Sequence, residues 1–179
     1  MKQLQMLLPA ERARAIPVWT PPAGYVVRAY QPGDEVGWSK LLVERGFDEW
    51  GDIPRLLEMG LKPIERLEGS RLVVHESGEI VAATMASQRT AEPLVGALDF
   101  VVGSPEHTGK QLGYGVCAAV VAYLVERGYP LIVLGTDDWR LAAIVTYLKL
   151  GFEPDLEHDA DMPERWAKIL AELKWPPSE

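Results

Sequence analysis

Residues 98–128, LDFVVGSPEHTGKQLGYGVCAAVVAYLVERG, place a glycine-rich loop between a short apolar run and a long apolar helical pattern. Glycines at 109, 113 and 115 allow a backbone to approach a ligand closely. The N-terminus of the following helix offers N–H groups without partners and a partial positive charge. The stretch therefore predicts a site for a phosphate-bearing ligand. Lys110 adds a positive charge to the loop, although a solvated loop lysine is an equally good interpretation.

Two common phosphate-binding motifs fit this loop poorly. A Walker A loop needs G-x-x-x-x-G-K-[ST], but GSPEHTGKQ has one residue too many and Gln111 in place of the hydroxyl residue. The run GYGVCA (113–118) matches the dinucleotide fingerprint G-x-G-x-x-G/A, and acidic residues follow at 137 and 138. That fingerprint must follow its strand directly, whereas the predicted strand ends well before Gly113. A nucleotide-binding oxidoreductase is therefore a distant alternative.

A third match carries a family resemblance. The run VVGSPEHTGKQLGYGV (101–116) resembles the acyl-coenzyme A loop of the GNAT superfamily of N-acetyltransferases, in which R/Q-x-x-G-x-G/A follows a strand. The matching positions are Thr108, Gln111 and Gly113, of which Gly113 alone keeps the family's residue type. The other two differences make a non-catalytic acyl-CoA-binding domain of the same fold the main alternative to an enzyme.

The run DDWRLAAIVTYLKLGFEP (137–154) is similar to the family's later motif, a helix that ends in Tyr-x-x-x-Gly-Phe. The matching residues are Tyr147, Gly151 and Phe152. With both motifs at the family's spacing, the chain is identified as a member of the GNAT superfamily.

The resemblance implies a reaction and its participants. Acetyl-CoA would be the cosubstrate, no metal would be needed, and a primary amine of a small molecule or peptide would attack the thioester directly. Tyr147 would supply a proton or hydrogen bond to the leaving sulfur, against the alternative of a core tyrosine with a satisfied hydroxyl. The family also splays two parallel strands so that the cofactor reaches the backbone of the first. The cofactor contacts implied are Val101, Val102, Thr108, Gly109, Lys110, Gln111, Gly113, Tyr114, Arg140 and Tyr147.

The attacking amine must lose a proton, and Asp99 is the candidate base. An acidic residue inside the apolar strand ALDFVVG is out of place, and burial would raise its pKa toward a useful range. A structural carboxylate that accepts backbone hydrogen bonds is an equally good interpretation. His107 precedes the loop, where a surface histidine is favoured over one beside the cofactor.

The segment RGFDEWGD (45–52) lies where relatives place the residues that cover the acceptor. Phe47, Asp48, Glu49 and Trp50 would together suit a cationic amine, but ordinary packing of the two aromatic side chains is the favoured interpretation. The acidic run EHDAD (157–161) lacks enough ligands for a metal and is interpreted as a solvated linker that caps the last helix.

These residues need a particular set of elements to position them. Strands are predicted at 24–30, 71–88 (a hairpin), 96–103, 130–136 and 152–154, and helices at 36–47, 53–61, 112–127, 140–150 and 161–174, the last with Asp161 and Glu164 as a capping box. A single crossover demands parallel strands. The prediction is an α+β fold with a mixed, mostly antiparallel central sheet flanked by helices and one βαβ crossover. The proline-rich residues 1–23 are interpreted as an arm packed on a single domain, 24–179.

Composition narrows the possible partners and location. The 179 residues are 47% apolar and 25% charged with a net charge of −8, and without a basic cluster nucleic acid is not an expected partner. The single cysteine, Cys117, is expected to be buried. Because one cysteine cannot form a disulfide within the chain, a reducing compartment is expected. No run predicts a signal peptide or a membrane span, so we expect a cytoplasmic protein. The resemblance adds a homodimer as a possible assembly.

Overall fold

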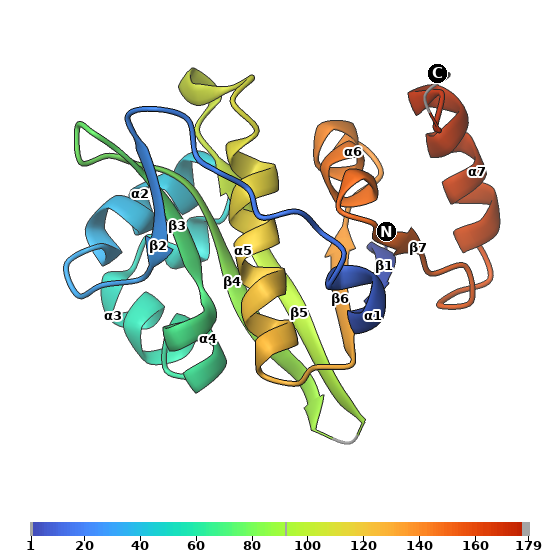
Figure 1. Ribbon diagram of the computed structural model, residues 1–179, viewed down its shortest axis with the longest axis horizontal. Coiled ribbons are helices and arrows are strands. Elements are labelled where there is room, and N and C mark those ends of the chain that lie inside the picture. Colours follow the sequence, from blue (N-terminus) through green and yellow to red (C-terminus); the bar gives the residue numbers. More distant parts are fainter. Residues whose placement is uncertain (1, 92, 177–179) are drawn as a thin grey trace.

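The computed structural model describes residues 2–91 and 93–176, and this part of the chain forms a seven-stranded sheet in the order β2-β3-β4-β5-β6-β1-β7 (Figure 1). Neighbouring strands are antiparallel except for β5 and β6, so the predicted mixed, mostly antiparallel sheet is confirmed. The strands are β1 (Leu4–Pro9), β2 (Tyr25–Ala29), β3 (Arg71–His75), β4 (Ile80–Ala91), β5 (Leu94–Gly103), β6 (Leu131–Thr136) and β7 (Glu153–Pro154).

The helices connect and cover these strands. They are α1 (Ala10–Ala13), α2 (Glu35–Glu44), α3 (Ile53–Arg55), α4 (Ile64–Gly69), α5 (Leu112–Glu126), α6 (Leu141–Lys149) and α7 (Met162–Leu173), with short 3₁₀ turns η1 (Asp48–Trp50) and η3 (Pro105–His107) and one π-helical turn, η2 (Leu56–Gly60). The segment predicted as one helix over 53–61 is thus α3 followed directly by the wider π turn. Helix α4 was not predicted.

Two hydrophobic clusters fill the two faces of the sheet. One lies beneath α5 and extends to α6 and α7, and the other joins α2 and η1 to the opposite face. Val73 belongs to the first cluster and its neighbour Leu72 to the second, as alternation along a strand requires. Figure 1 shows α5 lying along β4 and β5. Cys117 is fully buried in the first cluster, and burial raises the pKa of its thiol to about 12, so the expectation of an inert core cysteine is confirmed.

The N-terminal segment contributes a strand that the sequence analysis did not predict. Strand β1 lies between β6 and β7, antiparallel to both, and its residues Leu4, Met6 and Leu8 are fully buried. The alternation of buried and exposed residues was hard to see in the sequence, because Leu7 is apolar although it lies between two buried residues of the strand. The several prolines that follow also suggested an irregular segment. The remaining segment then crosses α5 to reach β2 (Figure 1), and the side chain of Trp19 lies against Gly115.

The predicted capping box of the last helix is wrong. Asp161 precedes α7 with a helical backbone and accepts no capping hydrogen bond with its side chain. Glu164 instead accepts a hydrogen bond from Lys168 at 2.7 Å, one turn further along the helix. An exposed ion pair along the helix surface has replaced the reciprocal cap.

Candidate functional site

The site forms where the two parallel strands separate. Strands β5 and β6 are paired only from Val95 opposite Leu131 to Leu98 opposite Leu134. The next part of β5 contains a bulge, since Asp99 is opposite Met85 while Val102 is opposite Ala83. Two residues of β5 therefore face one of β4, which bends the strand away from its parallel neighbour.

The bulge has a clear backbone signature. Phe100 has φ +50°, a left-handed conformation that is uncommon and costly for a residue with a bulky side chain. The buried hydroxyl of Thr84, the β4 residue opposite the bulge, donates a hydrogen bond to the Asp99 carbonyl at 3.0 Å. This bond satisfies a backbone acceptor that the irregular pairing leaves free. The expected separation of two parallel strands is therefore present, and Phe100 marks its start.

A first cavity of about 680 Å³ opens on one side of this separation. Nine of the ten predicted cofactor contacts line it: Val101, Val102, Thr108, Gly109, Gln111, Gly113, Tyr114, Arg140 and Tyr147. Lys110 is exposed and is not among the lining residues. The loop, the start of α5 and the start of α6 therefore converge on one concave surface.

The loop glycines have different functions. Gly109 has φ +79°, lines the cavity, and an added Cβ would meet nothing within 4 Å. Gly113 also lines the cavity with open space around it. Gly115 does not line the cavity, because a Cβ there would lie 2.1 Å from the Trp19 ring. The expectation that all three glycines admit a ligand is thus wrong for Gly115, which is required for packing of the N-terminal segment.

Gln111 occupies a position that favours glycine. It precedes α5 with φ +56° and ψ +25°, in the left-handed region. The first helical hydrogen bond of α5 runs from the Gly115 N–H to the Gln111 carbonyl at 2.9 Å. The N–H groups of residues 112–114 precede this bond and have no acceptor within the helix. They give the cavity a donor-rich, electropositive end suited to phosphate oxygens.

Tyr147 lies where this cavity meets a second one. It lines both, although only 2% of it is exposed. Burial raises the pKa of its hydroxyl far above the ordinary value, so the phenol stays protonated at neutral pH. Arg140 also lines both cavities, and its guanidinium donates a hydrogen bond to the Val101 carbonyl at 3.1 Å, across the separation.

The second cavity has a volume of about 540 Å³ and a charged lining. It contains the predicted Asp99 together with residues that the sequence analysis did not select. These are chiefly Gln3, Gln5, Arg89, Phe100 and Asp137, with Arg45 and Trp139 shared with the first cavity. Asp137, Trp139 and Arg45 lie inside runs that the sequence analysis quoted, but nothing local distinguishes them there. Gln3, Gln5 and Arg89 lie outside every motif, and all of these residues meet only after the sheet forms.

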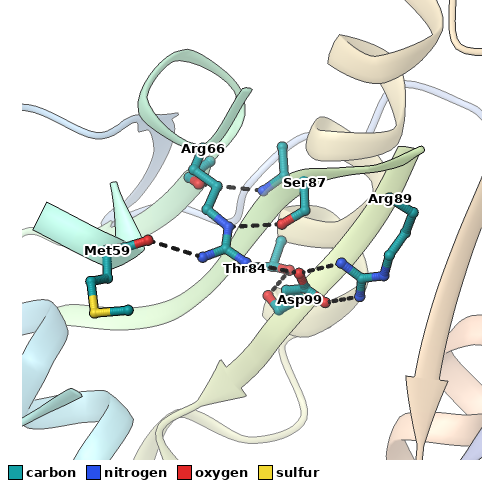
Figure 2. Close-up of polar contacts among 8 residues, drawn as sticks. Met59, Arg66, Thr84, Ser87, Arg89 and Asp99 are labelled. Atoms are coloured by element: carbon teal, nitrogen blue, oxygen red, sulfur yellow. Dashed lines mark hydrogen bonds and ion pairs between the residues drawn. The ribbon is translucent and has the colours of Figure 1, made fainter. Parts of the chain in front are cut away.

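Asp99 is surrounded by arginines (Figure 2). Its carboxylate accepts two hydrogen bonds from Arg89, one of them at 2.8 Å, and one from Arg66 at 3.3 Å. Burial alone raises the pKa of Asp99, but hydrogen bonds from Arg89 and Ser87 and the charges of Arg89 and Arg66 outweigh it, so the pKa is lowered. The predicted upward shift is therefore wrong.

The segment predicted to cover an acceptor is divided between two environments. Trp50 is buried and packs edge-to-face against Phe100, with 5.1 Å between the ring centres, as ordinary packing of this side chain predicts. Phe47 lines the second cavity and also packs edge-to-face against Phe100, with 5.3 Å between the ring centres. Asp48 and Glu49 are exposed and line neither cavity. The charges that this segment brings to the site come from Arg45 instead.

His107 is more involved in the site than expected. It is half-buried, lines the first cavity, and shares a 2.8 Å hydrogen bond with the Tyr25 hydroxyl. Within residues 2–91 and 93–176, no cluster of three potential ligands for a metal ion is present. Over the same residues, no helix is both long and apolar enough to span a membrane.

Known proteins with similar sequences are acetyltransferases. The chain is 28% identical over 162 residues to a mycothiol acetyltransferase of Salinispora arenicola, a match that covers 84% of this chain and 52% of that protein. It is 30% identical over 89 residues to N-acetyltransferase 8B of Rattus norvegicus, covering 48% of this chain and 40% of the relative. The chain thus spans about half the length of these relatives.

Solved structures share the fold. A GCN5-related N-acetyltransferase from Sphaerobacter thermophilus superposes with a TM-score of 0.68 at 21% identity, covering 87% of this chain and 50% of that one. A tandem GNAT protein from the clavulanic acid biosynthesis pathway gives 0.65 at 22% identity, covering 86% and 50%. The model of the acetyltransferase (GNAT) family matches residues 19–152, which include the bulge, the glycine loop and Tyr147. The chain therefore belongs to the acetyltransferase (GNAT) family.

Proposed function

We propose that this protein is an acetyl-CoA-dependent N-acetyltransferase that acetylates a primary amine of a small molecule or peptide. The observation that carries the proposal is the meeting of two cavities at Tyr147, one with an electropositive helix N-terminus and one with a charged lining. Such an arrangement supplies separate places for a donor and an acceptor on either side of one protonated hydroxyl.

The first cavity fits the donor. Gly109 and Gly113 leave open space where side chains would otherwise project, so the backbone is accessible to a diphosphate. The free N–H groups at the start of α5 lie beside them. Val101 and Val102 line this cavity beyond the end of the β5–β6 pairing, and we propose that the pantetheine chain lies along this part of β5. Backbone groups supply most of these contacts, so the replacements at Thr108 and Gln111 are compatible with binding.

The chemistry requires little from the side chains. Bound acetyl-CoA supplies an activated acyl group as a thioester; the amine forms the new C–N bond and the C–S bond breaks. A free thiol has a pKa of about 8.5, so the departing sulfur benefits from a proton donor. Tyr147 is protonated, lines both cavities, and is proposed as that donor.

The acceptor amine loses a proton as the bond forms, and two carboxylates line its cavity. Asp99 was predicted for this step, but its arginine partners stabilise the charged form and weaken it as a base. Asp137 follows β6, lines the same cavity, and pairs with no cation of the described residues within 4.0 Å. We therefore propose Asp137, directly or through water, as the proton acceptor and Asp99 as the group that positions Arg66 and Arg89.

The test combines calorimetric titration with acetyl-CoA and a thiol-release assay over a panel of primary amines. Saturable binding with amine-dependent thiol release supports the proposal. Binding without release from any amine would favour the alternative of a non-catalytic acyl-CoA-binding domain, and absence of binding contradicts both. Asp137→Asn should lower kcat more than Asp99→Asn if the roles are as proposed. The cytoplasmic location and the homodimer remain predictions.

A further inference from the structure

The second cavity is more cationic than the protein around it. The chain carries a net charge of −8, yet three arginines and two aspartates line this cavity: Arg45, Arg89, Arg140, Asp99 and Asp137. Arg66 lies directly behind Asp99, with its guanidinium 3.3 Å from the carboxylate. A local excess of positive charge in an otherwise acidic protein makes the electrostatic potential of this cavity positive, so the cavity attracts anions.

Asp99 cannot balance the charge of its own partners. One carboxylate accepts hydrogen bonds from both Arg66 and Arg89, and these side chains are only 19% and 42% exposed (Figure 2). The remaining acceptors of Arg66 are neutral, namely the Ser87 hydroxyl at 2.9 Å and the Met59 carbonyl at 3.4 Å. The cluster of Asp99, Arg66 and Arg89 therefore keeps one positive charge at the wall of the cavity.

Two further cations lack anionic partners. In the described part of the chain, no carboxylate oxygen lies within 4.0 Å of the guanidinium nitrogens of Arg45 or Arg140. The Arg140 guanidinium donates a hydrogen bond to the neutral Val101 carbonyl, and its central carbon lies 6.0 Å from the centre of the Phe47 ring; both contacts hold the group at the cavity. A planar guanidinium suits the two-pronged recognition of carboxylate and phosphate.

We propose that the acceptor is an amine that also carries an anionic group, a carboxylate or a phosphate monoester, bound by the arginines of the second cavity. Arg45, which is exposed at its mouth, contacts that group first, and Asp137 faces the ammonium end. This inference rests on the proposed function, because it assigns the second cavity to the acceptor. The anionic group is a recognition element and is unchanged by the transfer.

The test uses pairs of acceptors that share an amine and differ in charge. β-Alanine and 4-aminobutyrate are compared with their primary amides, and O-phosphoethanolamine with ethanolamine, by thiol release at saturating acetyl-CoA. We expect kcat/KM to favour the anionic member of at least one pair by about ten-fold or more. The carboxylate and phosphate arms separate the two sources of the charge.

Arg45→Gln is the informative variant, since an exposed side chain at a cavity mouth is replaced without disturbing the core. It should lower kcat/KM for the anionic member at least five-fold more than for its neutral partner. Because Arg45 also lines the first cavity, the Kd for acetyl-CoA is measured alongside, and an unchanged Kd assigns the side chain to the acceptor. Arg127→Gln removes the same charge from the exposed end of α5 and is the matched control, with no change expected.

Two outcomes would overturn this inference alone: equal or better use of the neutral members, or an Arg45→Gln variant that weakens acetyl-CoA binding and affects both members alike. The second result would assign the arginines to the donor. Either leaves the proposed function standing, because amines are still acetylated. An absence of acetyl-CoA binding and of thiol release with every amine contradicts the proposed function and this inference with it.

Discussion

The two residues that the sequence analysis selected for catalysis have pKa values shifted in opposite directions, although burial raises the pKa of both. At Tyr147 the loss of hydration outweighs the stabilisation that the Arg140 charge offers a phenolate, so the pKa is raised and the hydroxyl stays protonated. Asp99 is similarly removed from water, but Arg89 and Arg66 stabilise its charged form. The strand sequence ALDFVVG gives no sign of these arginines, since Arg66 comes from α4 and Arg89 from β4.

Replacement of Tyr147 tests its role as proton donor. Tyr147→Phe removes one hydroxyl from the junction of the two cavities, and we expect kcat to fall about 100-fold with little change in KM for acetyl-CoA. Tyr123→Phe is the control, because that hydroxyl is buried on α5 away from both cavities. Steady-state kinetics of both variants check the prediction, and normal turnover by Tyr147→Phe would remove the assignment.

Asp99 should stabilise the fold in a pH-dependent manner. Its pKa is lowered in the folded state, so its contribution is complete above the ordinary carboxyl pKa of 3.8 and is lost as the pH falls below that value. Asp99→Asn leaves Arg66 and Arg89 without a counter-charge and should cost about 2–3 kcal/mol at pH 7.

Urea unfolding of the wild type and Asp99→Asn at pH 7 and pH 3 measures this difference. The gap between the two proteins should narrow at pH 3, because this pH lies below the ordinary carboxyl pKa of 3.8 and the unfolded wild-type chain then binds a proton that the folded state resists. A gap that is equal at both pH values would show that the asparagine acts through altered packing and not through charge.

At the scale of elements, the glycine loop and the start of α5 combine two constraints within a few residues. One side of the helix must stay open to the first cavity, and the other must accept the crossing N-terminal segment. Gly113 serves the first and Gly115 the second, although the sequence alone suggested the same ligand-admitting role for both glycines. Periodicity locates the helix but does not show which long-range neighbour each glycine faces.

Alanine at these two positions should therefore separate binding from stability. Gly113→Ala places a methyl in open cavity space, so acetyl-CoA affinity should fall about ten-fold while stability is kept or raised by up to about 1 kcal/mol. Gly115→Ala must displace Trp19 and should cost about 2 kcal/mol. Calorimetry measures the Kd for acetyl-CoA of both variants, and thermal melts measure their stability. Similar effects of the two substitutions would contradict the separate roles of the two glycines.

The left-handed residue before α5 allows a complementary test. Gln111→Gly relieves a side chain at φ +56° and should raise stability by up to about 1 kcal/mol, with acetyl-CoA binding kept or improved. Gly109→Ala makes the reverse change at φ +79° and should lower stability by about 1 kcal/mol, because alanine is strained in the left-handed conformation. The cost should be no larger, since an added Cβ would meet no atom within 4 Å. Chemical denaturation of both variants provides the measurement, and a destabilised Gln111→Gly would indicate that the glutamine side chain makes a needed contact.

At the scale of the molecule, the N-terminal segment is part of the sheet and of the second cavity. Strand β1 pairs along the whole of β6, and Gln3 just before it and Gln5 within it line the same cavity as Arg89. The segment from β1 to β2 also crosses α5, so the N-terminal residues connect both halves of the site. Their contribution depends on pairing with a strand more than 120 residues later in the chain.

Core and surface positions of this segment should respond very differently to truncation. Leu8→Ala removes a fully buried side chain and should cost about 3 kcal/mol, as in other cores. Val18→Ala changes a residue that is 95% exposed and should alter stability by less than about 0.5 kcal/mol. Equal, small effects in urea unfolding would mean that β1 is only loosely attached to the sheet.

Features that depend on local spacing could be predicted from the order of residues. The strands and helices from 71 to 154, the loop that opens into α5, and the position of Tyr147 near the end of α6 follow from periodicity and from glycine punctuation. These features carried the fold class, while the donor side of the site came from the resemblance of two motifs to the GNAT superfamily. Four features emerged only in the folded chain: the insertion of β1, the bulge at Phe100, the pairing of Asp99 with two arginines, and the cationic second cavity. The physical reason is that strand pairing, desolvation and charge compensation depend on residues far apart in the chain, and one chain's local pattern contains no record of which distant side chains will meet.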